Sequence, residues 1–254
     1  MSKKNQTFDQ KIEQNQWFSV WFNTPFYHLL YNKRNYTEAD AFISKLLLLL
    51  KPAIGSRVLD LACGSGRHSI TLNRFGLDVL GVDLAENSID EAKRHENHQL
   101  HFEVQDMREV RYPGRFDYIF NLFTSFGYFN SLNDDEKVLL ACFDQLKPDG
   151  ILVLDYFNIE KIRPTLPSDE IEIRGAQKFI IHKKLYDNRI IKTIELMSEG
   201  EKFHFEESVA AYTLDDLVQM LGRCGFTIKY TFGNYALEND AENCDRVIII
   251  AQKN

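Results

Sequence analysis

The stretch Val58-Leu59-Asp60-Leu61-Ala62-Cys63-Gly64-Ser65-Gly66-Arg67 decides the fold class of this chain. Its first half is the apolar run of a buried strand, and its second half is a glycine-rich turn that leads into a helical segment through Ile70 and Leu72. Glycines directly after a buried strand let the backbone approach a ligand, and the following helix N-terminus supplies amide donors. The stretch therefore predicts a strand–loop–helix unit whose loop binds a ligand.

Outward from this loop, short apolar runs alternate with helical segments up to about residue 160. The expected strands are 57–61, 78–83, 100–104, 116–120 and 151–155, with helices after the first, second and fourth. The chain closes with a helix over 213–221 and two strands, 227–232 and 246–251, which we expect to form a hairpin. This alternation is typical of a mostly parallel sheet covered by helices.

A different pattern occupies the stretch from about residue 167 to residue 210. Four β-type runs follow one another there, with turn residues between them, at 171–174, 179–186, 190–197 and 203–209. They predict an antiparallel meander inserted into the α/β fold. We therefore expect one domain in three parts: a helical N-terminal cover (1–54), a core (55–160 and 211–254) and an inserted β lid (161–210).

Composition and charge exclude several classes of protein. The chain has 254 residues, of which 44% are hydrophobic, and a net charge of −7. Binding to nucleic acid or to an anionic membrane needs concentrated basic surface, so this charge argues against both. The four cysteines are far apart and the N-terminus shows no apolar signal segment, so we expect no metal site and a cytoplasmic protein. The spaced histidines 95, 98 and 101 cross from a helix end into a strand, which predicts a solvated connector.

Acidic residues around the glycine loop indicate the kind of ligand. Asp83 ends the second strand, where a carboxylate can accept hydrogen bonds from a ribose diol. A dinucleotide site expects a third glycine where Ser69 stands, and the carboxylate of Asp60 would repel a pyrophosphate. Asp60 suits a ligand with an amino group and a sulfonium, and Gln105-Asp106 could accept from an adenine amino group. These residues favour S-adenosylmethionine over NAD, and an NAD-dependent oxidoreductase is the alternative.

The sequence also resembles the class I S-adenosylmethionine-dependent methyltransferases over roughly residues 55–160 and 211–254. Asp60–Gly66 is similar to their glycine-rich first motif, Gly81–Leu84 to the second, Gln105–Met107 to the third and Phe116–Asn121 to the fourth. The resemblance implies a Rossmann-like α/β fold whose seven-stranded, mostly parallel sheet ends in an antiparallel last strand. Within the class, the chain most resembles small-molecule methyltransferases with an inserted antiparallel lid and an N-terminal helix over the cofactor.

The same resemblance implies S-adenosylmethionine as cofactor and a set of residues that bind it. Gly64 and Gly66 would line its methionine part, Asp83 the ribose, and Asp106 with Met107 the adenine. The full expected set is Asp60, Ala62, Cys63, Gly64, Gly66, Asp83, Leu84, Gln105, Asp106, Met107, Asn121 and Leu122.

The expected activity is methyl transfer to a small-molecule acceptor at O, N or C, and a non-catalytic S-adenosylmethionine-binding module is a further alternative. Tyr31 and Tyr128 are the candidate catalytic residues. Aromatic residues make up 13% of the chain, and we expect the later rings of the N-terminal segment, among them Phe22, Tyr27 and Tyr31, to cover the cofactor site. They would face Phe123, Phe126, Tyr128 and Phe129. Trp17 and Phe18 are expected only to pack, and His68 to lie on the surface.

Overall fold

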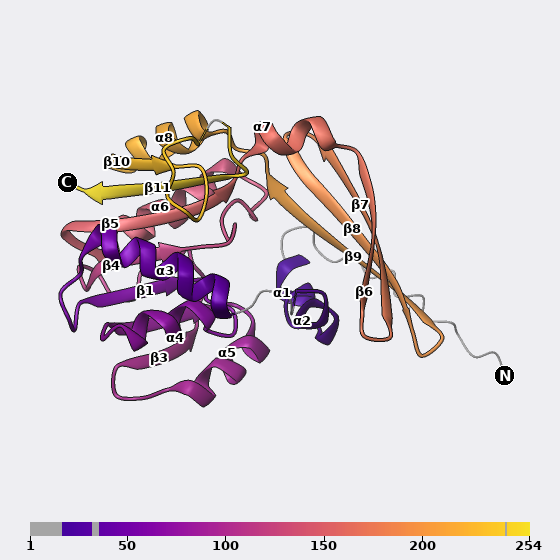
Figure 1. Cartoon of the computed structure of the whole chain (residues 1–254), viewed down its shortest axis with the longest axis horizontal. Coiled ribbons are helices and arrows are strands. Elements are labelled where there is room, and N and C mark those ends of the chain that lie inside the picture. The colour runs from indigo at the N-terminus through magenta and orange to yellow at the C-terminus, as the bar shows by residue number, and fades with distance from the viewer. Residues whose placement is uncertain (1–16, 32–35, 242) are drawn as a thin grey trace.

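A seven-stranded sheet and a separate four-stranded sheet form the frame of the molecule (Figure 1). The computed structural model describes residues 17–31, 36–241 and 243–254, and the statements below concern these residues. The large sheet has the order β10-β11-β5-β4-β1-β2-β3. Its strands are β1 (Arg57–Leu61), β2 (Asp78–Asp83), β3 (Leu100–Val104), β4 (Phe116–Asn121), β5 (Leu146–Phe157), β10 (Phe226–Phe232) and β11 (Arg246–Lys253). Only β11 runs against its neighbours, which confirms the predicted Rossmann-like sheet with an antiparallel last strand.

Helices cover both faces of this sheet because its strands are apolar on both sides. In β1, Val58 enters one hydrophobic core while Leu59 enters the other, and both side chains are fully buried. The helices that supply residues to the Val58 core are α3 (Tyr36–Leu50), α4 (Arg67–Arg74) and α5 (Glu86–Ala92). The Leu59 core is covered by α6 (Leu132–Gln145) and α8 (Leu214–Arg223).

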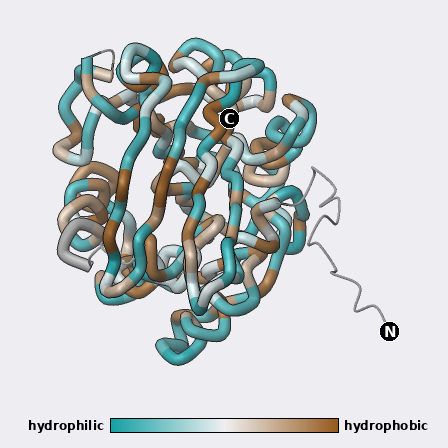
Figure 2. The backbone as a smooth tube through the Cα atoms, turned by 90° about the vertical axis from the view of Figure 1, so that its right-hand side faces the viewer, coloured by the Kyte–Doolittle hydropathy of each residue, from teal (hydrophilic) through white to brown (hydrophobic). Residues whose placement is uncertain are grey.

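The four-stranded sheet is the predicted insertion, which we call the lid sheet. Its strands β6 (Ser168–Arg174), β7 (Gln177–Tyr186), β8 (Arg189–Ser198) and β9 (Glu201–Ala210) pair antiparallel in chain order. Figure 2 shows the four strands side by side. The short helix α7 (Ile159–Ile162) and a 3₁₀ turn (Arg163–Thr165) connect the lid sheet to β5.

Two short N-terminal helices, α1 (Trp17–Trp21) and α2 (Pro25–Tyr31), lie between the two sheets (Figure 1). Trp21 and Leu30 share a hydrophobic core with Phe179 and Ile194 of the lid sheet. Both helices therefore pack against the inner face of the lid sheet. Residues 1–16 and 32–35, which belong to the predicted cover, lie outside the described residues. In the part of the chain that the structure describes, no helix is long and apolar enough to cross a membrane.

The start of β5 differs from the prediction. The sequence predicts this strand over 151–155, but β5 already begins at Leu146 and includes the turn-forming residues Pro148-Asp149-Gly150. The pairing with β4 shifts register within this stretch, from Phe116–Leu146 to Tyr118–Ile151. The turn-forming residues therefore produce an irregularity inside a strand, because strand pairing continues on both sides of them.

Gly66 is the residue that sets α4 against the large sheet. It has φ +80°, and a Cβ atom there would lie 2.6 Å from Cζ of Phe102 on β3. Gly200, in the turn between β8 and β9, has a similar φ of +83° but nothing within 4 Å of an added Cβ. An alanine at Gly200 would therefore have the backbone strain alone, whereas an alanine at Gly66 would have the strain and the steric overlap with Phe102.

We expect Gly200→Ala to lower the free energy of unfolding by about 1–2 kcal/mol, the strain of a left-handed alanine. Gly66→Ala should cost about 1–3 kcal/mol more, because Phe102 must also move. Chemical denaturation of both variants measures the difference, and equal losses would contradict the role given to Phe102.

Candidate functional site

A cavity of about 390 Å³ lies at the carboxyl ends of β1 to β4 and is closed on its other side by residues of α1 and α2. In the strand order, β1 is followed by β2 on one side and lies beside β4 on the other, so this is the point where the winding of the sheet reverses. Ligands of open α/β sheets bind at such a point. The expected cofactor residues that line the cavity are Ala62, Cys63, Gly64, Asp83, Leu84, Gln105, Asp106, Met107 and Leu122.

Asp83 holds the glycine loop and the end of β2 together. Its Oδ2 accepts a 2.8 Å hydrogen bond from the Gly64 amide, and its Oδ1 accepts one of 2.8 Å from the Ala85 amide. Burial raises the pKa of Asp83, and these amides partly offset the rise. A carboxylate has about four acceptor positions, so Asp83 can bind hydroxyl groups of a ligand in addition to both amides.

Asp60 lies behind the loop and does not line the cavity. Its side chain is fully buried, and the Ser69 hydroxyl donates to it at 2.5 Å. Burial raises the pKa of Asp60 to about 6, and the nearby Asp83 adds to the rise. Two carboxyl groups beside one loop, one buried and one at the cavity, favour a ligand that brings positive charge.

Gly66 and Asn121, also expected to bind the cofactor, lie outside the cavity lining. Gly66 packs against Phe102, as described above. Asn121 is buried at the end of β4, and its Nδ2 donates to the carbonyl of Leu61 at 3.1 Å. This bond ties the ends of β1 and β4, so Asn121 supports the cavity floor from behind.

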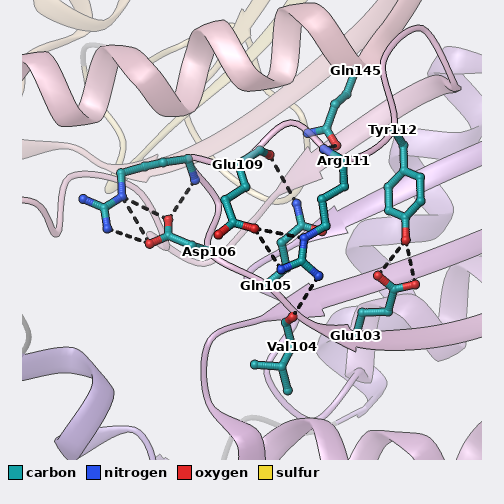
Figure 3. A network of polar contacts seen from close by, with 9 residues as sticks. Glu103, Val104, Gln105, Asp106, Glu109, Arg111, Tyr112 and Gln145 are labelled. Carbon is teal, nitrogen blue, oxygen red and sulfur yellow. Dashed lines mark hydrogen bonds and ion pairs between the residues drawn. The ribbon is translucent and has the colours of Figure 1, made fainter.

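The segment after β3 contributes Gln105, Asp106 and Met107 to the cavity lining. Figure 3 shows the polar contacts of this segment. Asp106 accepts hydrogen bonds from Arg108, at 2.6 Å from Nη2 and 2.9 Å from the amide. Burial alone would raise the pKa of Asp106, but Arg108 lowers it below the ordinary value. Gln105 donates from Nε2 to the carbonyl of Glu109 at 3.2 Å. Asp106 therefore faces the cavity as an ionised hydrogen-bond acceptor.

Aromatic side chains form a large part of the remaining lining. Phe22 and Trp17 pack against Tyr128 with ring centroids 5.6 and 5.5 Å apart, and Phe18 packs 5.6 Å from Phe129. The rings that line the cavity are Phe18, Phe22, Tyr27, Tyr31, Phe123, Tyr128 and Phe129.

Two expectations about these aromatic residues need correction. Phe126 does not face the cavity, because it is fully buried in the core beside β5. Phe18, expected only to pack, lines the cavity as well.

Tyr31 is joined to the lid sheet by its hydroxyl group. It donates to Glu207 at 2.6 Å and accepts a hydrogen bond from Lys192, while Trp21 Nε1 donates to the same Glu207 oxygen at 2.7 Å. Neither Glu207 nor Lys192 was identified from the sequence. The available signal was a pair of charged residues at inward-facing positions of strands whose other inward residues, such as Ile194, are apolar.

His68 was misjudged, whereas Phe123 was expected in the aromatic wall and does line the cavity. His68 was expected on the surface, but it is 7% exposed and lines the cavity. The centroid of its ring lies 4.9 Å from that of the Phe123 ring. The first turn of α4 continues directly from the loop, so its side chains share the cavity with the loop. Phe123 has φ +57°, and its amide donates at 2.8 Å to the buried Asp155, which Arg246 neutralises at 2.6 Å. By contrast, His95, His98 and His101 are exposed.

Comparison with known proteins agrees with this geometry. A family model for the methyltransferase domain matches residues 54–202. The chain belongs to this methyltransferase family. It is 29% identical over 207 residues to YqeM of Bacillus subtilis (strain 168), which carries a provisional methyltransferase name, with 78% of this chain and 84% of that protein covered. It is 27% identical to a glycine/sarcosine N-methyltransferase of Parasynechococcus marenigrum (strain WH8102), over 88% of this chain and 79% of that one.

A solved structure shares the fold of this methyltransferase. The S-adenosylmethionine-dependent methyltransferase from Clostridium acetobutylicum ATCC 824 superposes with a TM-score of 0.77 at 20% identity, covering 90% of this chain and 96% of that one. The family decides between the two cofactors considered above. The protein is an S-adenosylmethionine-dependent methyltransferase, and the NAD-dependent alternative is set aside.

The raised pKa of Asp60 predicts a pH-dependent affinity for the cofactor. Below about pH 6 the free protein carries a proton on Asp60, and a ligand with an ammonium group must displace it. The dissociation constant of S-adenosylhomocysteine should therefore be nearly constant above about pH 7 and rise by up to roughly tenfold per unit below about pH 6.

Calorimetry of the wild type, Asp60→Asn and Asp78→Asn across this range tests the assignment. Asp78 begins β2 at the opposite edge of the sheet, so its variant should keep the wild-type pH profile. Asp60→Asn should lose the pH dependence, and an unchanged profile in that variant would rule out Asp60 as the titrating group.

Proposed function

We propose that this methyltransferase transfers the methyl group of S-adenosylmethionine to a small molecule that binds between the glycine loop and the aromatic wall. One observation carries the proposal: acidic residues suited to the cofactor and a wall of aromatic rings line the same cavity. A volume of about 390 Å³ is in the range of small-molecule sites. We propose that residues 1–54 act as cover, 55–160 with 211–254 as core, and 161–210 as lid of one functional unit.

The groups that line the cavity suit each part of the cofactor: the methionine, the ribose and the adenine. The backbone of residues 62–64 would hold the methionine part, because nothing lies within 4 Å of a Cβ added at Gly64, so a ligand can approach the backbone there. Asp83 would accept from the ribose hydroxyls, and Gln105–Met107 with Leu84 and Leu122 would enclose the adenine. Asp60, Gly66 and Asn121 would act from behind these residues, by charge, close packing and support of the floor.

When bound, S-adenosylmethionine supplies a methyl group activated by its sulfonium. In-line transfer of such a group depends mainly on alignment and on exclusion of water. Tyr128 and Tyr31 would provide both, since their rings line the cavity and stabilise positive charge through their faces. The Tyr31 hydroxyl is engaged by Glu207 and Lys192, so Tyr31 would orient the acceptor, and Tyr128 would contact it directly.

An amine nitrogen is the first acceptor to test among the O, N and C acceptors considered. A relative that matches most of the chain is named for N-methylation of glycine and sarcosine. The net charge of −7 argues against a nucleic-acid acceptor. The four cysteines are free thiols, which supports a reducing, cytoplasmic location.

The assignment of Asp83 is tested by binding of S-adenosylhomocysteine. Asp83→Asn should weaken this binding roughly 10- to 100-fold, because hydrogen bonds to a charged group are lost. Calorimetry measures the change, with Asp78→Asn as the matched control on the same strand. An unchanged dissociation constant would exclude Asp83 from the ribose contact, and saturable binding of NAD in its place would refute the cofactor assignment.

The acceptor is identified by release of S-adenosylhomocysteine from S-adenosylmethionine. We expect at least one compound from a panel that includes glycine and sarcosine, or from the low-molecular-mass fraction of a cell extract, to support steady release and to gain one methyl group by mass spectrometry. Tyr128→Ala should lower this turnover by at least tenfold, because the acceptor loses its wall, while binding of S-adenosylhomocysteine stays within about twofold. Equal loss of both would show that Tyr128 acts on the cofactor.

A further inference from the structure

Arg189, the first residue of β8, reaches from the lid sheet to the wall of the cavity. Its guanidinium donates to the carbonyl groups of three consecutive residues: Phe129 at 2.8 Å, Gly127 at 3.2 Å and Tyr128 at 3.4 Å. On the lid side it donates to the hydroxyl and carbonyl oxygens of Ser208 at 2.7 and 2.9 Å. One side chain thus joins two lid strands to the segment that carries Tyr128 and Phe129.

This segment follows the end of β4 and precedes α6, so no regular hydrogen-bond ladder of a helix or strand sets its shape. Gly127 has φ +82°, and a Cβ there would lie 2.7 Å from the hydroxyl of Tyr156. The Gly127 carbonyl also accepts from the Ala210 amide of β9 at 2.8 Å. The backbone that places Tyr128 and Phe129 is therefore held largely by groups of the lid.

A buried acid opposes the charge of Arg189. Asp135 of α6 is fully buried and accepts a 2.7 Å hydrogen bond from the Tyr212 hydroxyl. Burial raises the pKa of Asp135 to about 6, and the hydrogen bond from Tyr212, the charge of Arg189 and the amide of Phe129 all act against the rise. Arg189 thus holds the carbonyl side of the segment, while Asp135 lies near the Phe129 amide and is held by Tyr212.

We propose that Arg189 is a positioning residue of the methyl-transfer site, which holds the 127–129 backbone so that Tyr128 and Phe129 form the wall for the methyl acceptor. This inference rests on the proposed function. A guanidinium suits the task because its rigid fork reaches several carbonyl groups at once, whereas a lysine ammonium is a single flexible donor. Among the described residues, the hydrogen bonds of Arg189 go to the 127–129 segment and to Ser208, and none goes to the cofactor residues Ala62–Gly64, Asp83 or Asp106.

The test compares Arg189→Lys and Arg189→Gln with Lys184→Gln, a charge-removing control at an exposed position of the lid sheet. The protein is labelled with 3-fluorotyrosine, and the fluorine signal of Tyr128 is assigned by its loss in Tyr128→Phe. We expect both Arg189 variants to shift or broaden this signal and the control to leave it unmoved. Arg189→Lys keeps the charge opposite Asp135, so it carries the test if Arg189→Gln does not fold.

Kinetics give the second readout, with glycine, sarcosine or the extract fraction as acceptor. The half-saturating acceptor concentration should rise roughly tenfold in Arg189→Lys, the effect of losing one or two hydrogen bonds. The dissociation constant of S-adenosylhomocysteine should stay within about twofold of the wild-type value, which a general loss of structure would not allow.

The outcomes separate the inference from the proposed function. A wild-type protein that fails to bind S-adenosylhomocysteine would refute the proposed function, and the inference with it. Wild-type binding together with an unmoved Tyr128 signal in Arg189→Lys would refute the inference alone, and this result needs no acceptor. A parallel fall in cofactor and acceptor affinity would also overturn it, because Arg189 would then act on the fold as a whole.

Discussion

The site depends on one carboxylate, that of Asp83, which ties the end of β2 to the loop that follows β1. It accepts from the amides of Gly64 and Ala85, at 2.8 Å each, so two neighbouring strand ends share one anion. Without a bound ligand the charged forms of Asp83 and Asp60 are disfavoured, because burial raises the pKa of both groups. A cationic ligand offsets that cost, so the same residues that destabilise the free site favour the bound one.

The opposite wall of the cavity depends on parts of the chain that are far apart in sequence. Three parts of the chain meet at this wall: the helices α1 and α2, the 127–129 segment, and the inner face of the lid sheet. Charged lid residues make the connections: Arg189 holds the 127–129 carbonyls, and Glu207 with Lys192 holds Tyr31. The lid sheet therefore acts on the cavity through these contacts, because they hold rings that line it.

Local rules were sufficient to predict most of the fold. Period-two and helical patterns placed the strands and helices to within a few residues, because each element buries an apolar face of matching periodicity. The rules failed at Pro148–Gly150, where turn-forming residues lie inside β5 as an irregularity because pairing with β4 continues on both sides of them. They also failed at His68, where only the path of α4 beside the cavity explains burial of a polar side chain.

The sequence by itself determined the Rossmann-like sheet, the inserted antiparallel sheet and the strand ends at which the cavity lies. It could do so because strand, glycine loop and terminal acid are contiguous signals, and the ends of parallel strands must meet at one edge. Only the tertiary structure decided which of the expected cofactor residues line the cavity and which, such as Asp60, Gly66 and Asn121, lie behind that lining. It also decided the aromatic wall and the contacts that hold it, those of Arg189 above all. The physical reason is that their contacts join segments whose spacing along the chain carries no information about their distance in space.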